Sequence, residues 1–312
     1  MNSIAFTKIA DIPAFPDEYA LITHSVANDG TLLFLFIELA AKDAVFGRDA
    51  GPSGGFARTK MAAPARFRLV GLQESRRFVL DLPLLDLTFP LVDIFPDGKV
   101  LMIGARSQWR SKDDYDLNGV VCDPGTGSTK RILLGDGIGR AYVDARGLIW
   151  VSYYDEGVYG NFGWGSPPGP EPVGSAGLAC FSEAGEKIWE FPGRMSDCYA
   201  LNVYGSEVVA YYYDDFPVCR ISSDFQVTYW KTDLKGCRAL AVTQSKALLS
   251  RQYDDAPMVG YLGFLHEGDL GNAQRVRLSL PEGSNASKYD LVGRGPHLYC
   301  FDASCVHRTT LA

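Results

Sequence analysis

The chain repeats one pattern of apolar and polar positions along most of its length. Each copy has an apolar stretch, a short polar turn that usually contains glycine, and a second, more strongly apolar stretch. The six copies are ITHSVANDGTLLFLFIE from Ile22, PLVDIFPDGKVLMIGAR from Pro90, RAYVDARGLIWVSYYDE from Arg140, YALNVYGSEVVAYYYDD from Tyr199, RALAVTQSKALLSRQYDD from Arg238 and YDLVGRGPHLYCFD from Tyr289. The turns NDG and PDG favour tight hairpins, because glycine adopts positive φ without a Cβ clash. Each copy therefore predicts a β-hairpin.

The residues after each hairpin predict the rest of the fold. Two further strand-like runs follow five of the hairpins, for example GLACFSEAGEKIWEF from Gly177 and PVCRISSDFQVTYW from Pro217. Four antiparallel strands that recur at intervals of about 50 residues are typical of propeller blades. The chain is thus predicted to be an all-β, six-bladed β-propeller that forms one domain over residues 1–312. A pair of β-sandwiches is the alternative, but it does not explain why the strongest hairpin opens every unit.

The last repeat predicts how the propeller closes. Only CVHRTTLA follows the sixth hairpin, so this blade lacks one strand. The segment IAFTKI, Ile4 to Ile9, precedes the first hairpin and has no partner of its own. Pairing of this N-terminal strand with the last blade would complete the blade and remove a free sheet edge.

Composition and charge narrow the classes of function. With 46% hydrophobic and 21% charged residues the chain is globular, and its 33 glycines and 17 prolines suit an all-β fold. The net charge of -7 argues against a nucleic-acid partner. No apolar run reaches the roughly 18 residues of a membrane span, and the N-terminal segment lacks the features of a signal peptide, so a cytoplasmic protein without a membrane partner is expected. Seven cysteines without a CxxC pair make a disulfide framework or a zinc knuckle improbable.

Long loops predict which face of the propeller binds. The connections between the second and third strands are expected on one face, and three of them are long: Ala41–Pro64, Arg106–Asn118 and Asp155–Gly177. Loops of this length are uncommon without a role in binding or catalysis. They carry three candidate aromatic anchors for recognition, Trp109, Phe162 and Trp164.

Three hairpins end on the same kind of segment, a tyrosine followed by two acidic residues. The segments are Tyr154, Asp155 and Glu156, then Tyr213, Asp214 and Asp215, then Tyr253, Asp254 and Asp255. Their equivalent positions in the third, fourth and fifth predicted blades place them in an arc on the face of the long loops. In one interpretation each acid accepts backbone N–H bonds and each tyrosine packs between blades. In the other, the segments form an aromatic and acidic rim that attracts cationic groups.

The first residues of the inner strands are expected to line the mouth of the central channel. They include Glu18, Arg140, Asp197, Tyr199 and Arg238. Two arginines beside a carboxylate can hold a ligand carboxylate or phosphate through forked hydrogen bonds. Alternatively, Arg140, Asp197 and Arg238 neutralise one another across neighbouring blades.

Motifs of known catalytic chemistry are weak in this sequence. GPSGG, from Gly51 to Gly55, matches the GxSxG pattern of serine hydrolases, but it lies in a loop without the strand and helix that the motif needs. Cys198 and Cys237 hold similar positions at the channel mouth, yet neither has a histidine nearby in the sequence to act as a base. A nucleophilic enzyme is therefore a minor alternative.

The segments PDGKVLMIG and DARGLIWVSYYDEGVYGN resemble blades of the six-bladed propellers that include the gluconolactonase and SMP-30 family and the NHL-repeat proteins. The second segment also resembles bacterial propellers without an assigned function. The resemblance to gluconolactonases implies a divalent cation at the channel mouth, held by Glu, Asn and Asp side chains. Glu18 and Asp197 match in residue type and blade position, whereas Arg140 and Arg238 stand where further ligands would be needed.

Two main hypotheses of function follow, beside a third in which the protein is a pure scaffold or subunit without an occupied pocket at the channel mouth. The first is a non-catalytic binding propeller that recognises a small polar molecule or a partner protein on its loop-rich face, with the Tyr-acid segments at the edge. The second is a metal-assisted hydrolase of a lactone or ester, in which a divalent cation at Glu18 and Asp197 activates water. Only the hydrolase hypothesis requires a bound divalent cation, so elemental analysis of the purified protein distinguishes it from the binding hypothesis.

Overall fold

The computed structural model confirms the predicted fold class, a six-bladed β-propeller. It describes residues 2–50, 55–74, 76–251, 258–266, 268–282, 284 and 289–312. Two compact units divide these residues: unit 1 is Met1–Ile12 with Asp197–Ala312, and unit 2 is Pro13–Ser196. Each unit contains three blades, and each blade is a sheet of at least four strands.

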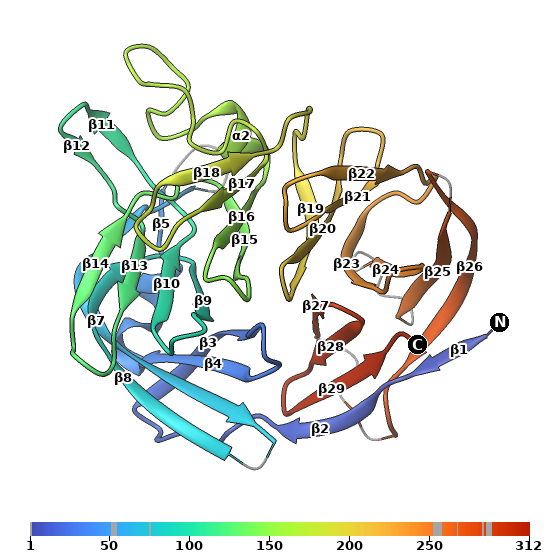
Figure 1. Ribbon diagram of the computed structural model, residues 1–312. Helices are drawn as coiled ribbons and strands as arrows, with labels where there is room; N and C mark the ends of the chain where they lie inside the picture. The colour runs from blue at the N-terminus through green and yellow to red at the C-terminus, as the bar shows by residue number, and fades with distance from the viewer. Residues whose placement is uncertain are drawn as a thin grey trace. The chain divides into compact units, whose positions relative to one another are not determined.

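Unit 2 contains the first three blades, each an antiparallel sheet whose strands follow one another in sequence order (Figure 1). The strands of these blades are β3 (Tyr19–Val26), β4 (Leu32–Glu38), β7 (Lys60–Gln73) and β8 (Arg76–Leu87); then β9 (Pro90–Ile94), β10 (Val100–Gly104), β13 (Gly119–Cys122) and β14 (Thr129–Ile132); then β15 (Ile138–Val143), β16 (Ile149–Tyr153), β17 (Leu178–Phe181) and β18 (Lys187–Glu190). The predicted turns are present, and Gly30 and Gly98 have φ of 87° and 89°.

Unit 1 contains the other three blades. Their strands are β19 (Cys198–Tyr204), β20 (Glu207–Tyr212), β21 (Val218–Ile221) and β22 (Val227–Trp230); then β23 (Cys237–Val242), β24 (Lys246–Arg251), β25 (Val259–His266) and β26 (Asp269–Ser279); then β27 (Asp290–Arg294), β28 (His297–Phe301) and β29 (Cys305–Thr310). The last blade takes its fourth strand from the N-terminus, as the sequence predicts.

That closure uses two short strands. β2 (Thr7–Asp11) pairs antiparallel with β29, with Thr7 opposite Arg308 and Asp11 opposite Cys305. Figure 1 shows β2, in blue, beside β29, in red. β1 (Ser3–Ala5) instead pairs parallel with β26 of the fifth blade. The predicted strand Ile4 to Ile9 is therefore split between two neighbouring sheets of unit 1.

The second strand of each blade lies at the centre of the packing. All five residues of β10 and all five of β16 are buried, because both faces of these strands pack against apolar side chains. In unit 2 one apolar cluster joins the first and second blades through Leu35, Val92 and Met102. A second cluster joins the second and third blades through Leu101 and Val151. The burial of continuous apolar runs explains why the hairpins dominate the sequence pattern.

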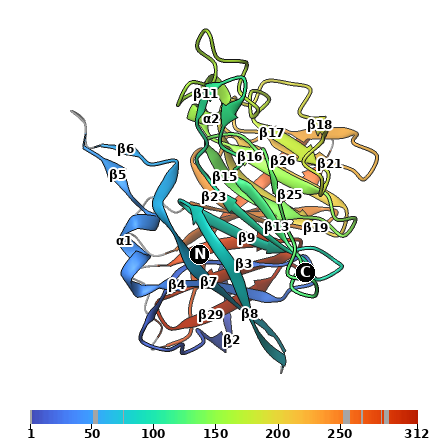
Figure 2. The same cartoon turned by 90° about the vertical axis from the view of Figure 1, so that its left-hand side faces the viewer.

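The long loops of unit 2 contain short elements of their own. The first has η1 (Leu39–Ala41), α1 (Lys42–Val45) and the strand pair β5 (Arg48–Asp49) and β6 (Phe56–Ala57); the second has β11 (Trp109–Ser111) with β12 (Asp114–Tyr115); the third has α2 (Asp155–Tyr159). Figure 2 shows α1 with β5 and β6 projecting from the first blade, and α2 beside β11. The Trp109 N–H donates to the Phe162 carbonyl at 2.9 Å and ties the second and third loops together.

No helix in the part of the chain that the structure describes is long and apolar enough to cross a membrane. The seven cysteines are free thiols, and Cys305 alone among them is only partly buried.

Candidate functional site

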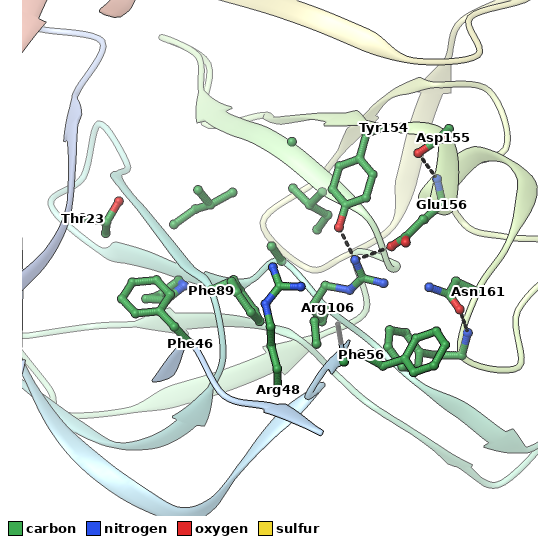
Figure 3. A pocket seen from close by; sticks show the side chains of 18 of the residues that line it. Thr23, Phe46, Arg48, Phe56, Phe89, Arg106, Tyr154, Asp155, Glu156 and Asn161 are labelled. Carbon is green, nitrogen blue, oxygen red and sulfur yellow. Dashed lines mark hydrogen bonds and ion pairs between the residues drawn. The ribbon is translucent and has the colours of Figure 1, made fainter. Parts of the chain in front are cut away.

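Described residues of unit 2 line a cavity of about 910 Å³, here called the unit 2 cavity. The long loops of the first and third blades form its sides, and the first residues of β9 and β15 form part of its floor. Its main aromatic and charged lining residues are Phe46, Arg48, Phe56, Phe89, Arg106, Tyr154, Asp155 and Glu156 (Figure 3). Phe162 lines it as well. A volume of this size suits a small organic ligand.

Arg106, two residues after the end of β10, is the centre of the polar network of the cavity. Its Nη1 donates to the Tyr154 hydroxyl and, at 2.5 Å, to a Glu156 carboxylate oxygen, while Nη2 donates to Asp136 Oδ2 at 3.0 Å. The side chain is 7% exposed, and its guanidinium carbon lies 4.8 Å from the centroid of the Phe162 ring. Two carboxylates and two aromatic rings thus hold this arginine in one position.

Burial changes the ionisation of the groups that surround Arg106. It raises the pKa of Asp136 to about 6, although the Arg106 charge and the Ser107 N–H, which donates to Oδ1 at 2.8 Å, act in the opposite direction. Burial also raises the pKa of Tyr154 to about 12, so its hydroxyl keeps its proton at neutral pH. Tyr154 therefore presents a neutral hydroxyl to the cavity.

Two glycines place α2 against the segment that precedes β15. The Tyr154 N–H donates to the Gly137 carbonyl at 3.0 Å. A Cβ atom added to Gly137, which has a φ of 66°, would lie only 2.3 Å from the backbone nitrogen of Gly157. The two backbones therefore approach closely only because both residues lack a side chain. This contact brings Glu156 within reach of Arg106.

The opposite side of the cavity is aromatic and basic. Arg48 lies on β5 with its guanidinium carbon 5.9 Å from the centroid of the Phe89 ring, and the Phe46 and Phe89 rings pack edge to face at 5.8 Å. Asp49, next to Arg48, pairs with Arg58 at 2.7 Å. Among the described residues no carboxylate pairs with Arg48. In Figure 3, Arg48 and Phe89 lie on the other side of Arg106 from Glu156.

Two phenylalanines of the cavity have an unusual backbone conformation. Phe89 and Phe162 have φ of 48° and 47°, a region that residues with a bulky side chain rarely occupy. Phe89 faces Arg48 and Phe162 faces Arg106. Strained backbone of this kind concentrates at functional sites, so both rings are held at the cavity at a cost in stability.

The structure brings one predicted segment to this cavity. Tyr154, Asp155 and Glu156 all line it. Asp155 also accepts the Glu156 N–H at 2.8 Å, so the acid takes part in a local backbone contact as well as facing the cavity. Binding by these residues stays a prediction.

The predicted aromatic anchors differ in their exposure. Phe162 lines the cavity, but Trp109 and Trp164 are not among the described residues that do so. Trp164 is 4% exposed, and its indole N–H donates to the Ser107 carbonyl at 3.0 Å. This hydrogen bond links the third loop to the second, so Trp164 has a structural role. Arg140 lies on β15, next to the lining residue Gly139, and its N–H donates to the Ser152 hydroxyl.

In unit 1 the predicted residues form an aromatic cluster. Tyr199 lies 6.1 Å from Tyr213 and 6.0 Å from Phe216 between ring centroids, and the Arg238 guanidinium lies 4.1 Å above the Tyr199 ring. Tyr213, whose N–H donates to the Asp197 carbonyl, is 52% exposed. Asp214 and Asp215 follow in the same turn, in which Asp215 has a φ of 58°. The third segment, Tyr253, Asp254 and Asp255, lies outside the described residues, as does most of GPSGG.

A cation site formed by Glu18 and Asp197 stays a prediction. Glu18 belongs to unit 2 and Asp197 to unit 1. Among the described residues only Asp302, Cys305 and His307 form a group of three His, Cys, Asp or Glu side chains within 4.8 Å of one another. Asp302 already accepts the backbone N–H groups of Ser304 and Cys305, and its other oxygen lies 3.0 Å from His307 Nε2. This group joins the turn before β29 to the strand itself.

The thiols at the predicted channel mouth are buried. Cys198 is 6% exposed, and burial raises the pKa of the Cys237 thiol to about 11. A thiol that stays protonated at neutral pH is a poor nucleophile.

Sequence reasoning missed the residues on which this site depends most. Arg106 was visible only as the first residue of a long loop, and Asp136 lies 30 residues further on with no motif that links them. Arg48 and Phe89 likewise belong to separate segments. Only the folding of three blades into one unit makes these residues neighbours.

Comparison with known proteins adds evidence on the fold. A family model described as the YxzG family matches residues 176–307, which is less than half of the chain. No curated protein matches the sequence significantly.

Solved structures with a similar fold have very different sequences. A streptogramin B lyase is similar with a TM-score of 0.50 and 9% identity, over 97% of this chain and 96% of that chain. A virginiamycin B lyase from Staphylococcus aureus gives 0.49 and 10%, over 94% and 98%. The calcium-binding protein regucalcin from Agrobacterium tumefaciens gives 0.47 and 10%, over 100% and 96%. At such identities the similarity concerns the fold alone.

Proposed function

We propose that this protein binds a small organic molecule in the unit 2 cavity and does not transform it. The observation that carries the proposal is the cavity itself, about 910 Å³ in volume and lined by four phenylalanines and by the Tyr154, Asp155 and Glu156 segment. Mostly apolar walls with a few fixed polar groups are typical of ligand sites. The concave shape favours a small molecule over a partner protein.

Asp155 is the polar group that we expect the ligand to meet on the α2 side. Glu156 is already paired with Arg106, whereas no cationic side chain pairs with Asp155 among the described residues. The side chain of Asp155 is exposed at the cavity. An amine or another hydrogen-bond donor of the ligand fits this carboxylate.

The chemistry of the lining supports binding rather than nucleophilic catalysis. The described residues that line the cavity include no serine, cysteine, histidine or lysine. Arg106 is held by two carboxylates, so its charge is balanced within the protein. The ligand would thus meet rigid rings and fixed polar groups.

Fluorescence titration with N-phenyl-1-naphthylamine, an uncharged aromatic probe, tests whether the cavity takes up such molecules. Phe56 is 61% exposed at the cavity, and Phe264 in unit 1 is 51% exposed and distant in sequence from the lining. We expect Phe56→Ala to raise the probe's Kd by about fivefold, since a ring contact is lost, and Phe264→Ala to leave it unchanged. Equal effects of both substitutions, or no binding at all, would refute the proposal.

A cationic probe tests the role of Asp155. N-(1-naphthyl)ethylenediamine carries a protonated amine at neutral pH. Asp155→Asn should raise its Kd by about threefold, because one partly screened ion pair is removed, and should not change the Kd of the uncharged probe. An equal change for both probes would show that the carboxylate does not recognise the cationic group.

A further inference from the structure

We propose that the ligand of the unit 2 cavity carries an oxyanion, such as a carboxylate, that binds Arg48, next to an apolar body that packs on Phe46, Phe56 and Phe89. This inference rests on the proposed function, since it names the chemical class that the same cavity selects. It depends on how the charges of the two cavity arginines are balanced.

Arg106 is not available to a ligand anion. Its Nη1 and Nη2 atoms donate to Glu156 and Asp136, and the Phe162 ring covers the guanidinium at 4.8 Å. A ligand carboxylate would have to displace one of these carboxylates. The second arginine of the cavity is therefore the candidate for anion binding.

Among the described residues Arg48 has no carboxylate partner. The adjacent carboxylate, Asp49, is occupied by Arg58 through Nε at 2.7 Å. In the part of the chain that the structure describes, the charge of Arg48 meets only the ring of Phe89, at 5.9 Å. An arginine with free N–H donors binds a carboxylate or another oxyanion by forked hydrogen bonds.

The surroundings of Arg48 set the rest of the ligand. Phe46 is 42% exposed and packs on Phe89, and Phe56 belongs to the strand that pairs with β5, on which Arg48 lies. Phe46, Phe56 and Phe89 thus line the same cavity as Arg48, and Phe89 contacts its guanidinium. Such a site favours an acid with an aromatic or alkyl body over inorganic anions, because burial of the apolar body adds to the ion pair.

A matched pair of fluorescent probes isolates the anionic group. 8-Anilinonaphthalene-1-sulfonate and N-phenyl-1-naphthylamine share one ring system and differ only in the sulfonate. Arg48→Gln should raise the Kd of the sulfonate by about tenfold, the size of one lost charge-assisted hydrogen bond, and change the Kd of the uncharged probe less than about twofold. Arg48→Lys should lie between, since it keeps the charge but not the fork.

Controls separate the anion site from general effects. Arg275 is an exposed arginine on β26 of unit 1, so Arg275→Gln should leave both probes unaffected. Raising NaCl from about 50 mM to about 500 mM should weaken sulfonate binding to the wild type but not to Arg48→Gln.

The outcomes distinguish the two proposals. If Phe56→Ala weakens the uncharged probe but Arg48→Gln affects both probes equally, or neither, the cavity binds ligands and the oxyanion inference is wrong. If Phe56→Ala leaves the uncharged probe unaffected, the proposed function itself fails. Selective loss of the sulfonate in Arg48→Gln, with the uncharged probe retained, supports both.

Discussion

Arg106 and Asp136 form a buried ion pair in unit 2, with 3.0 Å between Nη2 and Oδ2 and with side chains that are 7% and 1% exposed. The pair joins the segment after β10 to the segment before β15, and so links the second blade to the third. Glu156 extends it to α2. The same ion pairs therefore stabilise unit 2 and hold Arg106 and Glu156 in place at the cavity.

The ionisation of Asp136 makes stability depend on pH. Its folded pKa of about 6 lies above the usual value of 3.8, so the folded protein holds this proton more tightly than the unfolded chain. The contribution of Asp136 to the free energy of unfolding is then full below about pH 4 and falls, by at most about 3 kcal/mol, as the pH rises to about 6. Asp136→Asn removes this titration.

Urea unfolding of both proteins at several pH values measures the effect. We expect the stability of the wild type relative to Asp136→Asn to decline from about pH 4 to about pH 6. Other carboxyls titrate in both proteins and cancel in the difference. A difference that grows with pH would show that Asp136 has a lowered pKa.

Removal of the positive partner should be strongly destabilising. Arg106→Leu leaves Asp136 buried without its ion-pair partner, which costs about 3 to 5 kcal/mol of unfolding free energy at neutral pH. Arg66 and Glu38 form an exposed pair at 3.4 Å, so Arg66→Leu should cost less than about 1 kcal/mol. Chemical denaturation measures both. Similar losses would mean that the buried network contributes no more than a surface pair.

The close approach of Gly137 and Gly157 should not tolerate a side chain. Gly137→Ala would place a Cβ 2.3 Å from the Gly157 nitrogen in a backbone with positive φ. We expect a loss of about 2 to 4 kcal/mol and weaker probe binding, because α2 must move away from Arg106. Gly127, which also has positive φ but has no atom within 4 Å of the added Cβ, is the control. A loss at Gly127→Ala as large as that at Gly137→Ala would attribute the effect to φ alone.

Closure of unit 1 depends on an N-terminal side chain as well as on strand pairing. Phe6, between β1 and β2, is 3% exposed and belongs to the apolar cluster that contains Leu278 and Leu298. Phe6→Ala should therefore cost about 3 to 5 kcal/mol, as for other buried phenylalanines. Phe264→Ala, at an exposed position, should cost less than about 0.5 kcal/mol. Equal melting temperatures of the two variants would show that the N-terminal segment does not support the fold.

Thiol titration provides a rapid check of burial. Burial raises the pKa of Cys122 to about 11 and that of Cys180, Cys219 and Cys300 to about 12. Cys305 is the one partly exposed thiol among the seven. A disulfide reagent at slightly alkaline pH should therefore modify one thiol rapidly in the native protein and seven in denaturant. Rapid modification of several native thiols would contradict the buried positions.

The sequence by itself determined the fold class. Apolar strands and Asx-Gly turns are encoded by residues close together in the chain, and counting the repeats shows that the last blade lacks one strand. The sequence did not indicate the short helix α2, which begins at Asp155 within the first Tyr-acid segment. The split of the N-terminal segment between β26 and β29 could not be predicted, since it depends on the register of two sheets.

Only the tertiary structure decided the site. The pairing of Arg106 with Asp136 and the contact of Arg48 with Phe89 depend on side chains from separate blades and loops of unit 2, whose distances no spacing in the sequence encodes. The burial of Trp164, in contrast to the exposed position of Phe56, depends on how each loop folds over its own side chains. Local propensity determines strands and turns, whereas charge balance and exposure arise from contacts between residues that are distant in sequence.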